Sequence, residues 1–260
     1  MSATTTASDR RREPPLRLPG GPGAYAFFLD VDGTILEIAP TPDLVHVDPG
    51  LLALLGTLRA AADGALALVS GRTVAAVDRL FAPLQLPVAG QHGAERRDAA
   101  GGRHDAKRGA AHLAALRRCV DTWATGLDGL RVEDKGLSLA VHYRQAPQLE
   151  GQVYHRLKEC LARADGALRL QPGRMVLEAK PVDRDKGVAV RAFMTEAPFA
   201  GRVPLFVGDD VTDEDGFAAV RQLGGHAVKV GDGDSIAPWR LPDVGAVRAW
   251  LEAIANGTAP

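Results

Sequence analysis

The chain has 260 residues, which is enough for one large domain or two small ones. Apolar residues make up 46% and charged residues 24%, as in an ordinary soluble globular protein. The 31 Lys and Arg nearly balance the 32 Asp and Glu, for a formal net charge of -1. No charge excess therefore favours a nucleic acid or an anionic membrane as a partner. No run approaches the ~18 apolar residues of a membrane span, and we expect a cytoplasmic protein.

Two features outside the regular pattern have simple interpretations. Residues 1–22 are rich in Ser and Thr and then in Arg, and they lack the apolar centre of a signal peptide, so they predict a disordered tail. Cys119 and Cys160 stand apart from any Cys-x-x-Cys or Cys/His framework. We expect two small buried thiols, and nothing predicts an oxidising compartment.

The first part of the chain alternates between strands and helices. Residues 24–29 form a short apolar run typical of a strand buried on both faces, and Asp30 follows at its carboxyl end. Asp48 begins a helix as its N-cap, with Leu residues at helical spacing behind it. A second buried strand at 65–69 ends at Ser70, and Thr73 caps a helix running to Phe81. This rhythm predicts a parallel sheet.

The pattern changes between about residues 100 and 180. Apolar and polar residues alternate over 137–144, which predicts a strand with one side facing solvent. The elements expected around it are helices near 110–125 and 148–164 and strands at 167–170 and 175–179. These elements predict a small antiparallel α+β insert.

The parallel pattern returns after Pro181. A helix begins at Lys186, a buried strand at 203–207 ends at Gly208-Asp209-Asp210, and further elements follow at 212–223, 226–230 and 243–255. The predicted fold class is α/β, a Rossmann-like parallel-sheet core with an inserted smaller α+β cap domain. We expect residues 23–104 and 182–260 to form the core and 105–181 the cap, with hinges near 98–108 and 180–185.

Polar segments follow several of the predicted strands. Ligands of open α/β sheets bind beyond the carboxyl ends of the strands, so we expect these segments to meet. Together they offer a carboxylate nucleophile, a second acid, a hydroxyl, an ammonium and an acidic cluster, which is what aspartyl-phosphate chemistry with a hard divalent metal needs. The segments are Asp30-Val31-Asp32-Gly33-Thr34, Ser70-Gly71-Arg72, Lys186 and Gly208-Asp209-Asp210-Val211-Thr212-Asp213-Glu214.

The carboxylates divide into a nucleophile, an acid/base and metal ligands. Asp30 is the candidate nucleophile, and it can attack phosphorus only when a cation such as Mg²⁺ screens the negative charges. We expect Asp30, Asp209 and the backbone carbonyl of Asp32 to bind that metal. The Asp32 side chain is the candidate general acid and base. Asp210 and Asp213 remain alternative ligands or outer partners.

The remaining core residues would handle the phosphate. Ser70 and Lys186 would hold phosphoryl oxygens, and Lys186 would also offset the charge of Asp30. Thr34 would orient Asp32 by a hydrogen bond. Thr34 and Arg72 are also candidate substrate-binding residues.

In this order the four segments resemble the motifs of the haloacid-dehalogenase-like phosphatase superfamily. Further segments look like the trehalose-6-phosphate phosphatase family, over roughly residues 24 to 250. They are Ser70-Gly71-Arg72, His92-Gly93-Ala94-Glu95, Glu133-Asp134-Lys135-Gly136, His142-Tyr143-Arg144, Leu177-Glu178-Ala179-Lys180-Pro181 and Gly208 to Glu214.

The resemblance implies Mg²⁺-dependent hydrolysis of trehalose 6-phosphate to trehalose and phosphate, as a step of trehalose biosynthesis. Asp30 would be the phosphorylated residue, and the cap residues Glu133, Lys135, Arg144 and Glu178 would grip the sugar. A functional link to a trehalose-6-phosphate synthase would follow, whereas the oligomeric state stays open. Carboxylates that accept from sugar hydroxyls, beside Lys and Arg that donate, agree with this role.

Other interpretations remain for parts of the pattern. Glu133 and Lys135 could be a solvated loop pair, and Glu178 an edge-strand charge. His92 is more typical of a turn than of proton transfer, because Asp32 already fills that role. The protein could also act on sucrose 6-phosphate or a hexose phosphate. A phospho-accepting sensor module or a non-catalytic sugar-phosphate binder is the more distant alternative.

Overall fold

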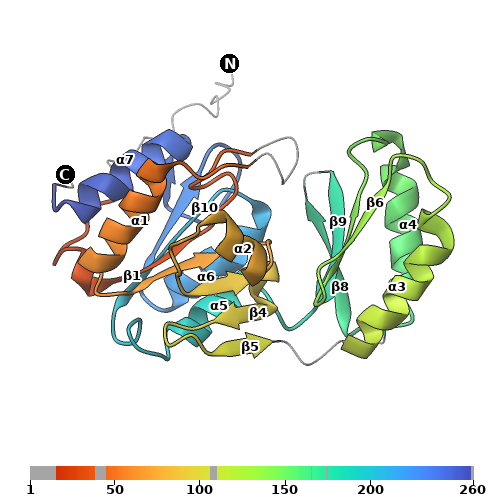
Figure 1. The fold of residues 1–260 in the computed structure, drawn as a ribbon, viewed down its shortest axis with the longest axis horizontal. Helices are drawn as coiled ribbons and strands as arrows, with labels where there is room; N and C mark the ends of the chain where they lie inside the picture. The colour runs from red at the N-terminus through yellow and green to blue at the C-terminus, as the bar shows by residue number, and fades with distance from the viewer. Residues whose placement is uncertain (1–15, 39–44, 106–109, 165, 174, 259–260) are drawn as a thin grey trace, which may run out of the picture.

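Hydrophobic side chains are buried in two separate clusters, one in a larger core and one in a smaller cap beside it (Figure 1). The computed structural model describes residues 16–38, 45–105, 110–164, 166–173 and 175–258. Chain segments from both sides of the cap form the core, which confirms the predicted α/β fold with an inserted α+β cap. Within the described residues no helix is long and apolar enough to cross a membrane.

The core is built on one eight-stranded sheet. Its strands are β1 (Tyr25–Leu29), β2 (Leu66–Val69), β3 (Val88–Gly90), β4 (Glu95–Arg97), β5 (Arg103–Asp105), β10 (Val203–Gly208), β11 (His226–Val230) and β12 (Trp239–Leu241). Their order is β12-β11-β10-β1-β2-β3-β4-β5, parallel from β12 to β3 and antiparallel at β4 and β5. The strand that leads to Asp30 therefore lies in the middle of the sheet.

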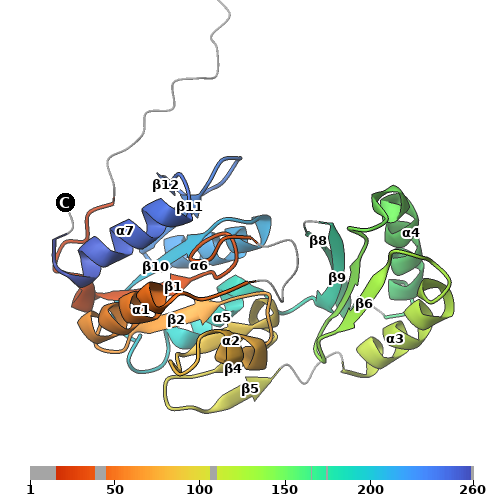
Figure 2. The same ribbon diagram turned by 45° about the horizontal axis from the view of Figure 1, so that its top comes forward.

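Helices cover both faces of this sheet. They are α1 (Pro49–Ala61), α2 (Val74–Leu80), α5 (Lys186–Phe193), α6 (Glu214–Gln222) and α7 (Val244–Ala255). Helices α1 and α7 lie together over one face, whereas α5 and α6 lie over the other (Figure 2). The predicted N-caps are confirmed, because Asp48 accepts from the Leu51 amide at 3.0 Å and Thr73 from the Ala76 amide at 3.1 Å.

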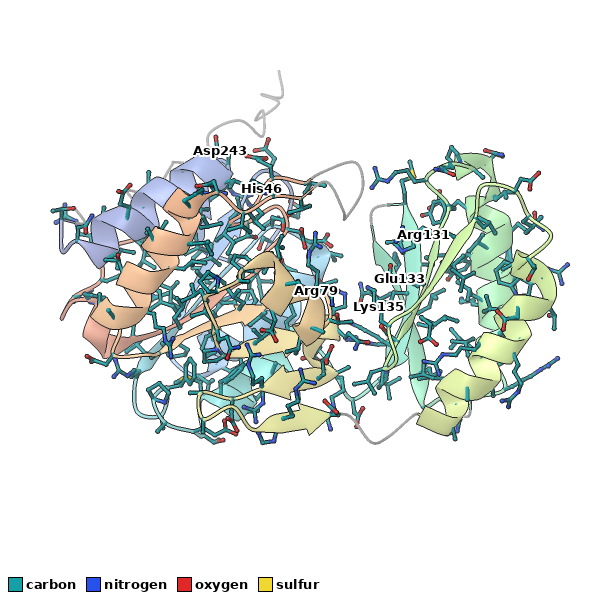
Figure 3. All side chains as sticks on the ribbon, in the orientation of Figure 1. His46, Arg79, Arg131, Glu133, Lys135 and Asp243 are labelled. Atoms are coloured by element: carbon teal, nitrogen blue, oxygen red, sulfur yellow. A yellow bond between two sulfur atoms is a disulfide. The ribbon has the colours of Figure 1, made fainter. Side chains whose placement is uncertain are left out.

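The cap is a four-stranded antiparallel sheet with two helices on one face. Its elements are α3 (Ala110–Ala124), β6 (Arg131–Asp134), β7 (Leu139–His142), α4 (Glu150–Leu161), β8 (Leu168–Gly173) and β9 (Val176–Pro181), with the strand order β6-β7-β9-β8. Leu139, Val141 and Tyr143 pack with residues of the helices. The other face turns toward the core, and Figure 3 shows Glu133 and Lys135 on that side.

The face of residues 137–144 that was expected to be solvent-exposed is largely covered. Ser138 and Ala140 are fully buried, at 0% exposure, although Arg144 is exposed. Alternation correctly predicted two different faces, but its polar face meets the core instead of water. The expectation of a wet face was wrong for this reason at Ser138 and Ala140.

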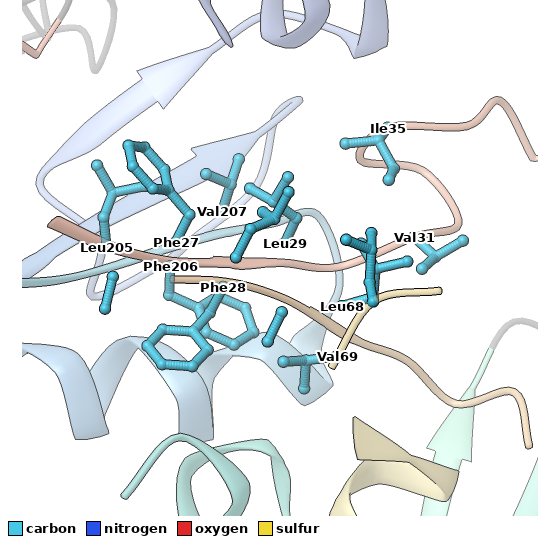
Figure 4. Close-up of a cluster of buried hydrophobic side chains, with 14 of the residues drawn as sticks. Phe27, Phe28, Leu29, Val31, Ile35, Leu68, Val69, Leu205, Phe206 and Val207 are labelled. Atoms are coloured by element: carbon cyan, nitrogen blue, oxygen red, sulfur yellow. The ribbon is translucent and has the colours of Figure 1, made fainter. Parts of the chain in front are cut away.

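The apolar runs of the core explain why its sheet is buried on both sides. Phe28 of β1 lies opposite Phe206 of β10 in the parallel register. Phe28 packs on Phe193 of α5, and Phe206 packs edge-on against Phe217 of α6, with ring centroids 5.9 and 5.6 Å apart. Phe27 points to the opposite face (Figure 4). Every residue of β1 is buried, so this strand fixes Asp30 firmly at its end.

Sequence periodicity missed the short and polar strands. The predicted strands corresponding to β1, β2, β7, β8, β9, β10 and β11 are confirmed, but β3, β4, β5, β6 and β12 were not predicted. Four of these five have only three residues, and β6 has the mostly exposed sequence Arg-Val-Glu-Asp. Such strands are defined by their neighbours in the sheet and carry little apolar signal of their own.

The two cysteines form a disulfide between Cys119 of α3 and Cys160 of α4. The expectation of two separate thiols was therefore wrong. The residues are 41 positions apart and meet only because the two helices pack side by side on the cap sheet. No local spacing pattern contains that information.

The predicted tail of residues 1–22 falls partly outside the described residues, which begin at residue 16. Leu16 is only 6% exposed and belongs to the core cluster. Its carbonyl accepts a hydrogen bond from the Trp250 indole of α7 at 3.3 Å. The last part of the expected tail is thus packed on the core, contrary to the prediction. Part of the first predicted hinge, residues 106–109, also lies outside the described residues.

Candidate active site

Asp30 is held at the carboxyl end of the central strand. Its amide donates to the Val207 carbonyl of β10 at 3.0 Å, so the parallel pairing continues one residue past β1. The residue is 5% exposed. The Lys186 ammonium donates to Asp30 at 2.8 Å and to Asp213 at 2.7 Å. Lys186 is the first residue of α5, whose N-cap is Asp185.

Three carboxylates gather around this ammonium. Asp30, Asp209 and Asp213 each offer an oxygen within 4.8 Å of the others. Burial and the charge of Asp213 raise the pKa of Asp30 well above its ordinary value. The same two causes raise the pKa of Asp209 to about 6. Burial alone would lower the pKa of Lys186, but Asp213 and Asp30 raise it well above its usual range.

The loop that carries Asp209 is tied down from two sides. Lys229, buried on β11, donates to the Asp209 backbone carbonyl and to the Val230 carbonyl. Gly33, at φ +84°, lies directly against the Asp209 carboxylate, where any Cβ would collide with it. Only glycine fits this position without displacing the carboxylate.

The structure distinguishes the two residues that sequence left as alternatives. Asp213 belongs to the carboxylate group and is fully buried, at 0% exposure. Asp210 is exposed and caps the short helix Val211–Asp213 by accepting from the Val211 amide at 2.7 Å. Asp213 also accepts from the Asp210 amide at 2.9 Å, so it supports the loop as well as the ammonium.

Asp32 forms an ion pair outside the group of three carboxylates. Its two carboxylate oxygens accept from Nε and Nη2 of Arg72, both at 2.7 Å. Ser70 is buried, and its hydroxyl accepts from the Arg72 amide at 3.1 Å, so it shapes the loop that presents the guanidinium. A bidentate pair of this kind fixes both side chains in one orientation.

Thr34 contacts different partners from the expected one. Its hydroxyl lies 3.4 Å from an Asp30 oxygen and 3.3 Å from an Asp209 oxygen. The predicted hydrogen bond from Thr34 to Asp32 was therefore wrong. Thr34 is fully buried, at 0% exposure, and it bridges the nucleophile candidate and the neighbouring acid. The turn after β1 directs the hydroxyl inward, which the sequence pattern does not specify.

Cap residues reach the core site from the face of the cap sheet. Lys135 donates to the Gly71 carbonyl of the core and to Glu178 of β9, both at 3.2 Å. Burial would raise the pKa of Glu178, but contacts from His92, Lys135 and Ser138 hold it well below its usual value. The structure thus brings Lys135 and Glu178 together at the core surface.

Glu133 lies further along the same face and is paired within the cap. It accepts from His142 of β7 at 2.8 Å, and this hydrogen bond lowers the pKa of Glu133. Arg144 follows β7 and is exposed. The hydrogen bond to Asp32 raises the pKa of Arg72 in the core, and the charge of Glu133 also helps to raise it.

Sequence reasoning gave no role to Gln91 and Lys229, and it placed His92 in a turn without its contact to the cap. Gln91 and His92 of the core contact the cap, and Lys229 supports the Asp209 loop. A signal existed for Lys229, because a lysine in the apolar strand His-Ala-Val-Lys-Val needs a buried acceptor. Gln91 gave no such signal, and the pattern around His92 did not indicate a contact with the cap, since both contacts depend on the docked cap.

The donor set fits a hard divalent cation. Asp30 and Asp213 are buried and Asp209 is half-buried. Within the described residues Lys186 donates to Asp30 and Asp213. Burial and the charge of Asp213 raise the pKa of both Asp30 and Asp209. Clustered carboxylate oxygens are what Mg²⁺ and similar ions prefer. A cation there would relieve the repulsion that the pKa shifts report.

The parallel sheet, the inserted cap and the acids at the strand ends have the arrangement of the haloacid-dehalogenase-like fold. In agreement, a phosphatase of the haloalkanoate (HAD) superfamily from Bacteroides thetaiotaomicron has the same fold, with a TM-score of 0.61 over 94% of this chain and 98% of that one, at 14% identity. More narrowly, the chain belongs to the trehalose-phosphatase family, whose model matches residues 28–244.

Named relatives agree with this family. The trehalose-6-phosphate phosphatase of Escherichia coli (strain K12) is 45% identical over 242 residues, which cover 93% of this chain and 91% of the relative. A solved structure described as a trehalose-6-phosphate phosphatase related protein is 26% identical and has a TM-score of 0.74. It matches 88% of this chain and 96% of its own.

Proposed function

We propose that the protein hydrolyses trehalose 6-phosphate to trehalose and phosphate through an aspartyl-phosphate formed on Asp30. The observation that carries this proposal is the buried Asp30 carboxylate at a strand end, bonded to Lys186 and grouped with Asp209 and Asp213. A buried carboxylate with a fixed cation is prepared for attack on phosphorus, and it has no evident structural use. The relatives named above support the choice of substrate.

Two steps balance the chemistry. A carboxylate oxygen of Asp30 forms a bond to phosphorus as the bond from phosphorus to the sugar oxygen breaks, and Asp32 gives its proton to that oxygen. Water then attacks phosphorus while Asp32 takes its proton, and the Asp30 carboxylate is released with phosphate. Lys186 stays protonated throughout, because its raised pKa keeps it cationic, and it stabilises the negative charge.

Mg²⁺ is the proposed cofactor. Asp30, Asp209 and the Asp32 backbone carbonyl would hold it, and it would neutralise the charges of the nucleophile and the phosphate. Asp213 would contribute through Lys186, to which it is hydrogen-bonded. Thr34 would hold the carboxylates of Asp30 and Asp209 next to each other. Arg72 would hold the Asp32 carboxylate in place until the substrate binds.

The cap would select the sugar. We assign sugar contacts to Lys135 and Glu178, whose side chains face the core, and to Glu133 and Arg144 further along the cap. Docking of this face over the phosphate would exclude bulk water and complete the site. A functional link to an enzyme that makes trehalose 6-phosphate follows from the same proposal.

A phosphatase for another sugar phosphate is the nearest alternative, because the core chemistry would be the same. A sensor module is less consistent with the inserted cap. The test is phosphate release from trehalose 6-phosphate, sucrose 6-phosphate and glucose 6-phosphate, each with Mg²⁺ and with EDTA. Mg²⁺-dependent preference for trehalose 6-phosphate is the expected result. Preference for another sugar phosphate would overturn the proposed substrate. No phosphate release from any of them would overturn the proposed phosphatase activity.

A further inference from the structure

We propose that Gln91 and His92 form a latch that fixes the register of the cap on the core and so orients Glu178 and Lys135 toward the sugar. They are positioning residues, not catalytic ones. The sugar half of this inference rests on the proposed function. The latch itself stands on contacts between core and cap.

The backbone of the latch has an unusual conformation. Gln91 and His92 have φ values of +48° and +55°, in the left-handed region that residues other than glycine seldom occupy. Such conformations are unfavourable for residues with a side chain and persist where the surroundings impose them, often at functional sites. The run continues through Gly93 at φ +93°, where a glycine adopts it without strain, so Gln91 and His92 carry the cost of this turn.

The core side of the latch is anchored to the loop that carries Ser70 and Arg72. The His92 amide donates to the Ser70 carbonyl at 2.9 Å, and the Gln91 amide donates to the Arg72 carbonyl at 2.8 Å. The Gln91 side-chain amide also donates to Glu95 at 2.9 Å. The latch is therefore held directly against the catalytic strand ends, and whatever docks on it takes its position from them.

On the cap, the latch contacts the chain just after the Lys135-Gly136 turn and, through Ser138, reaches Glu178. The side-chain oxygen of Gln91 accepts from the Leu137 amide at 3.2 Å, and the Ser138 hydroxyl oxygen lies 3.2 Å from it. Ser138 in turn donates to Glu178 at 2.5 Å. Because Leu137 and Ser138 immediately follow the Lys135-Gly136 turn, Gln91 fixes that turn through its backbone.

His92 completes the latch between the Gly71 backbone and Glu178. Its Nε2 lies 3.4 Å from a Glu178 oxygen, and a Cβ at Gly71 would lie 2.8 Å from the imidazole ring. Only glycine at position 71 leaves room for the ring. The His92 Nδ1 is buried and has no hydrogen-bond partner within the described chain. The neutral ring with its proton on Nε2 fits these surroundings. The charged ring would also carry a proton on Nδ1, and that buried donor would have no acceptor within the described residues.

Glu178 is therefore set by three groups at once, one from the core and two from the cap itself. His92 is the core contact, Ser138 links Glu178 to Gln91, and Lys135 bridges Glu178 and the Gly71 carbonyl. A substrate that relies on Glu178 and Lys135 needs this arrangement. A small phosphate ester without a sugar does not, because Asp30 and Lys186 are built by the core alone.

The test uses His92→Phe, which keeps a ring beside Gly71 and removes the donor to Glu178. We expect kcat/KM for trehalose 6-phosphate to fall roughly 10- to 100-fold, the size of a lost hydrogen bond to a charged group. Hydrolysis of p-nitrophenyl phosphate should stay within twofold. His226→Phe is the matched control, because His226 lies on β11 beside Tyr25 and should leave both substrates unchanged.

Ser138→Ala probes the same latch from the cap without altering the strained backbone, and we expect the same selective loss. A second measurement needs no substrate. In Gln91→Gly, which tolerates positive φ, the Leu137 amide should exchange its hydrogen with solvent faster than in the wild type.

The outcomes separate the latch from the proposed function. Equal losses on both substrates in His92→Phe, or no loss on either, would overturn the latch. Unchanged exchange at Leu137 in Gln91→Gly would also overturn it. If the wild type hydrolyses p-nitrophenyl phosphate but not trehalose 6-phosphate, the proposed substrate is wrong, and the exchange experiment still decides whether the latch exists.

Discussion

The core and the cap present charged residues to each other in different ways. In the core, Asp30, Lys186 and Asp213 are at most 5% exposed, and buried strand ends and helix starts fix them. In the cap, Glu178 and Ser138 are buried partly by their contacts with the core, and Glu133 stays half-buried. The core site is thus complete in itself, whereas the cap site is completed by docking. This difference supports the proposal that the core carries the chemistry and the cap the selectivity.

The strongest test of the core is the variant Asp30→Asn. We expect turnover to fall by several orders of magnitude with every phosphate ester, because the amide cannot form the aspartyl-phosphate. The fold should survive, since an amide relieves repulsion with Asp213 and Asp209. Phosphate release and far-ultraviolet circular dichroism measure the two effects. Asp121→Asn, on the exposed side of α3, is the control, and near-normal turnover in Asp30→Asn would rule out the nucleophile.

The cap has a covalent constraint that the core lacks. Replacing Cys119 and Cys160 together by Ala should lower the stability of the oxidised cap by about 2–4 kcal/mol, the usual effect of a disulfide closing a loop of this size. Urea unfolding followed by hydrogen exchange of cap and core peptides measures it. Treating the wild type with dithiothreitol should reproduce the change. A loss spread equally over the core would contradict the idea of two separately stabilised units.

Selectivity should depend on the cap. In Glu178→Ala the preference for trehalose 6-phosphate over glucose 6-phosphate should fall by roughly tenfold, because a buried carboxylate that accepts from sugar hydroxyls is lost. The ratio of the two kcat/KM values is the measurement. Glu159→Ala, on the exposed side of α4, provides the control. An unchanged ratio would remove Glu178 from the sugar site.

The same contrast explains what sequence could predict. Continuous apolar runs such as residues 24–29 define buried parallel strands, and polar residues after them fall at one edge of the sheet. Asp30, Lys186 and Asp209 were therefore predicted from local pattern and order. The Thr34 contact was predicted wrongly, because the direction of a side chain in a tight turn depends on tertiary neighbours.

Features that exist only between elements were missed. The Cys119–Cys160 bond needs two helices to meet, and the Gln91 contacts need two domains to dock. The strand β6 is mostly polar and was not predicted, because it is defined by pairing with β7. Periodicity reports which face of an element is apolar, and it does not report what covers the other face.

The role of Lys229 in holding the loop that carries Asp209 can be tested by substituting this lysine. Replacing it by Met keeps the length of the side chain but leaves the Asp209 and Val230 carbonyls without their donor. We expect a loss of about 2 kcal/mol in the free energy of unfolding and weaker Mg²⁺ binding. Chemical denaturation and titration calorimetry measure these changes. Lys158→Met, exposed on α4, should change stability by less than about 0.5 kcal/mol. Unaltered Mg²⁺ affinity would separate Lys229 from the site.

The smallest effect concerns the pH dependence of the metal-free core. The pKa of Asp209 is raised from 3.8 to about 6 in the folded state, and that of Asp30 is raised as well. A raised folded pKa means that ionisation costs more in the folded protein than in the unfolded chain. The resulting stability is present below the unfolded pKa and is lost as pH rises through about 6.

The metal-free protein should therefore lose roughly 1 kcal/mol between about pH 4 and pH 6 through Asp209, after allowance for solvent screening. Urea unfolding in EDTA across this range measures the slope. Asp209→Asn should flatten it, whereas Asp210→Asn, exposed at the same loop, should not. Mg²⁺ should reverse the trend, because it binds the ionised carboxylates. The stability of the cap should show no such change with Mg²⁺, since the raised carboxylate pKa values belong to the core. If the pH dependence of stability were the same in the wild type and in Asp209→Asn, Asp209 would not be its source.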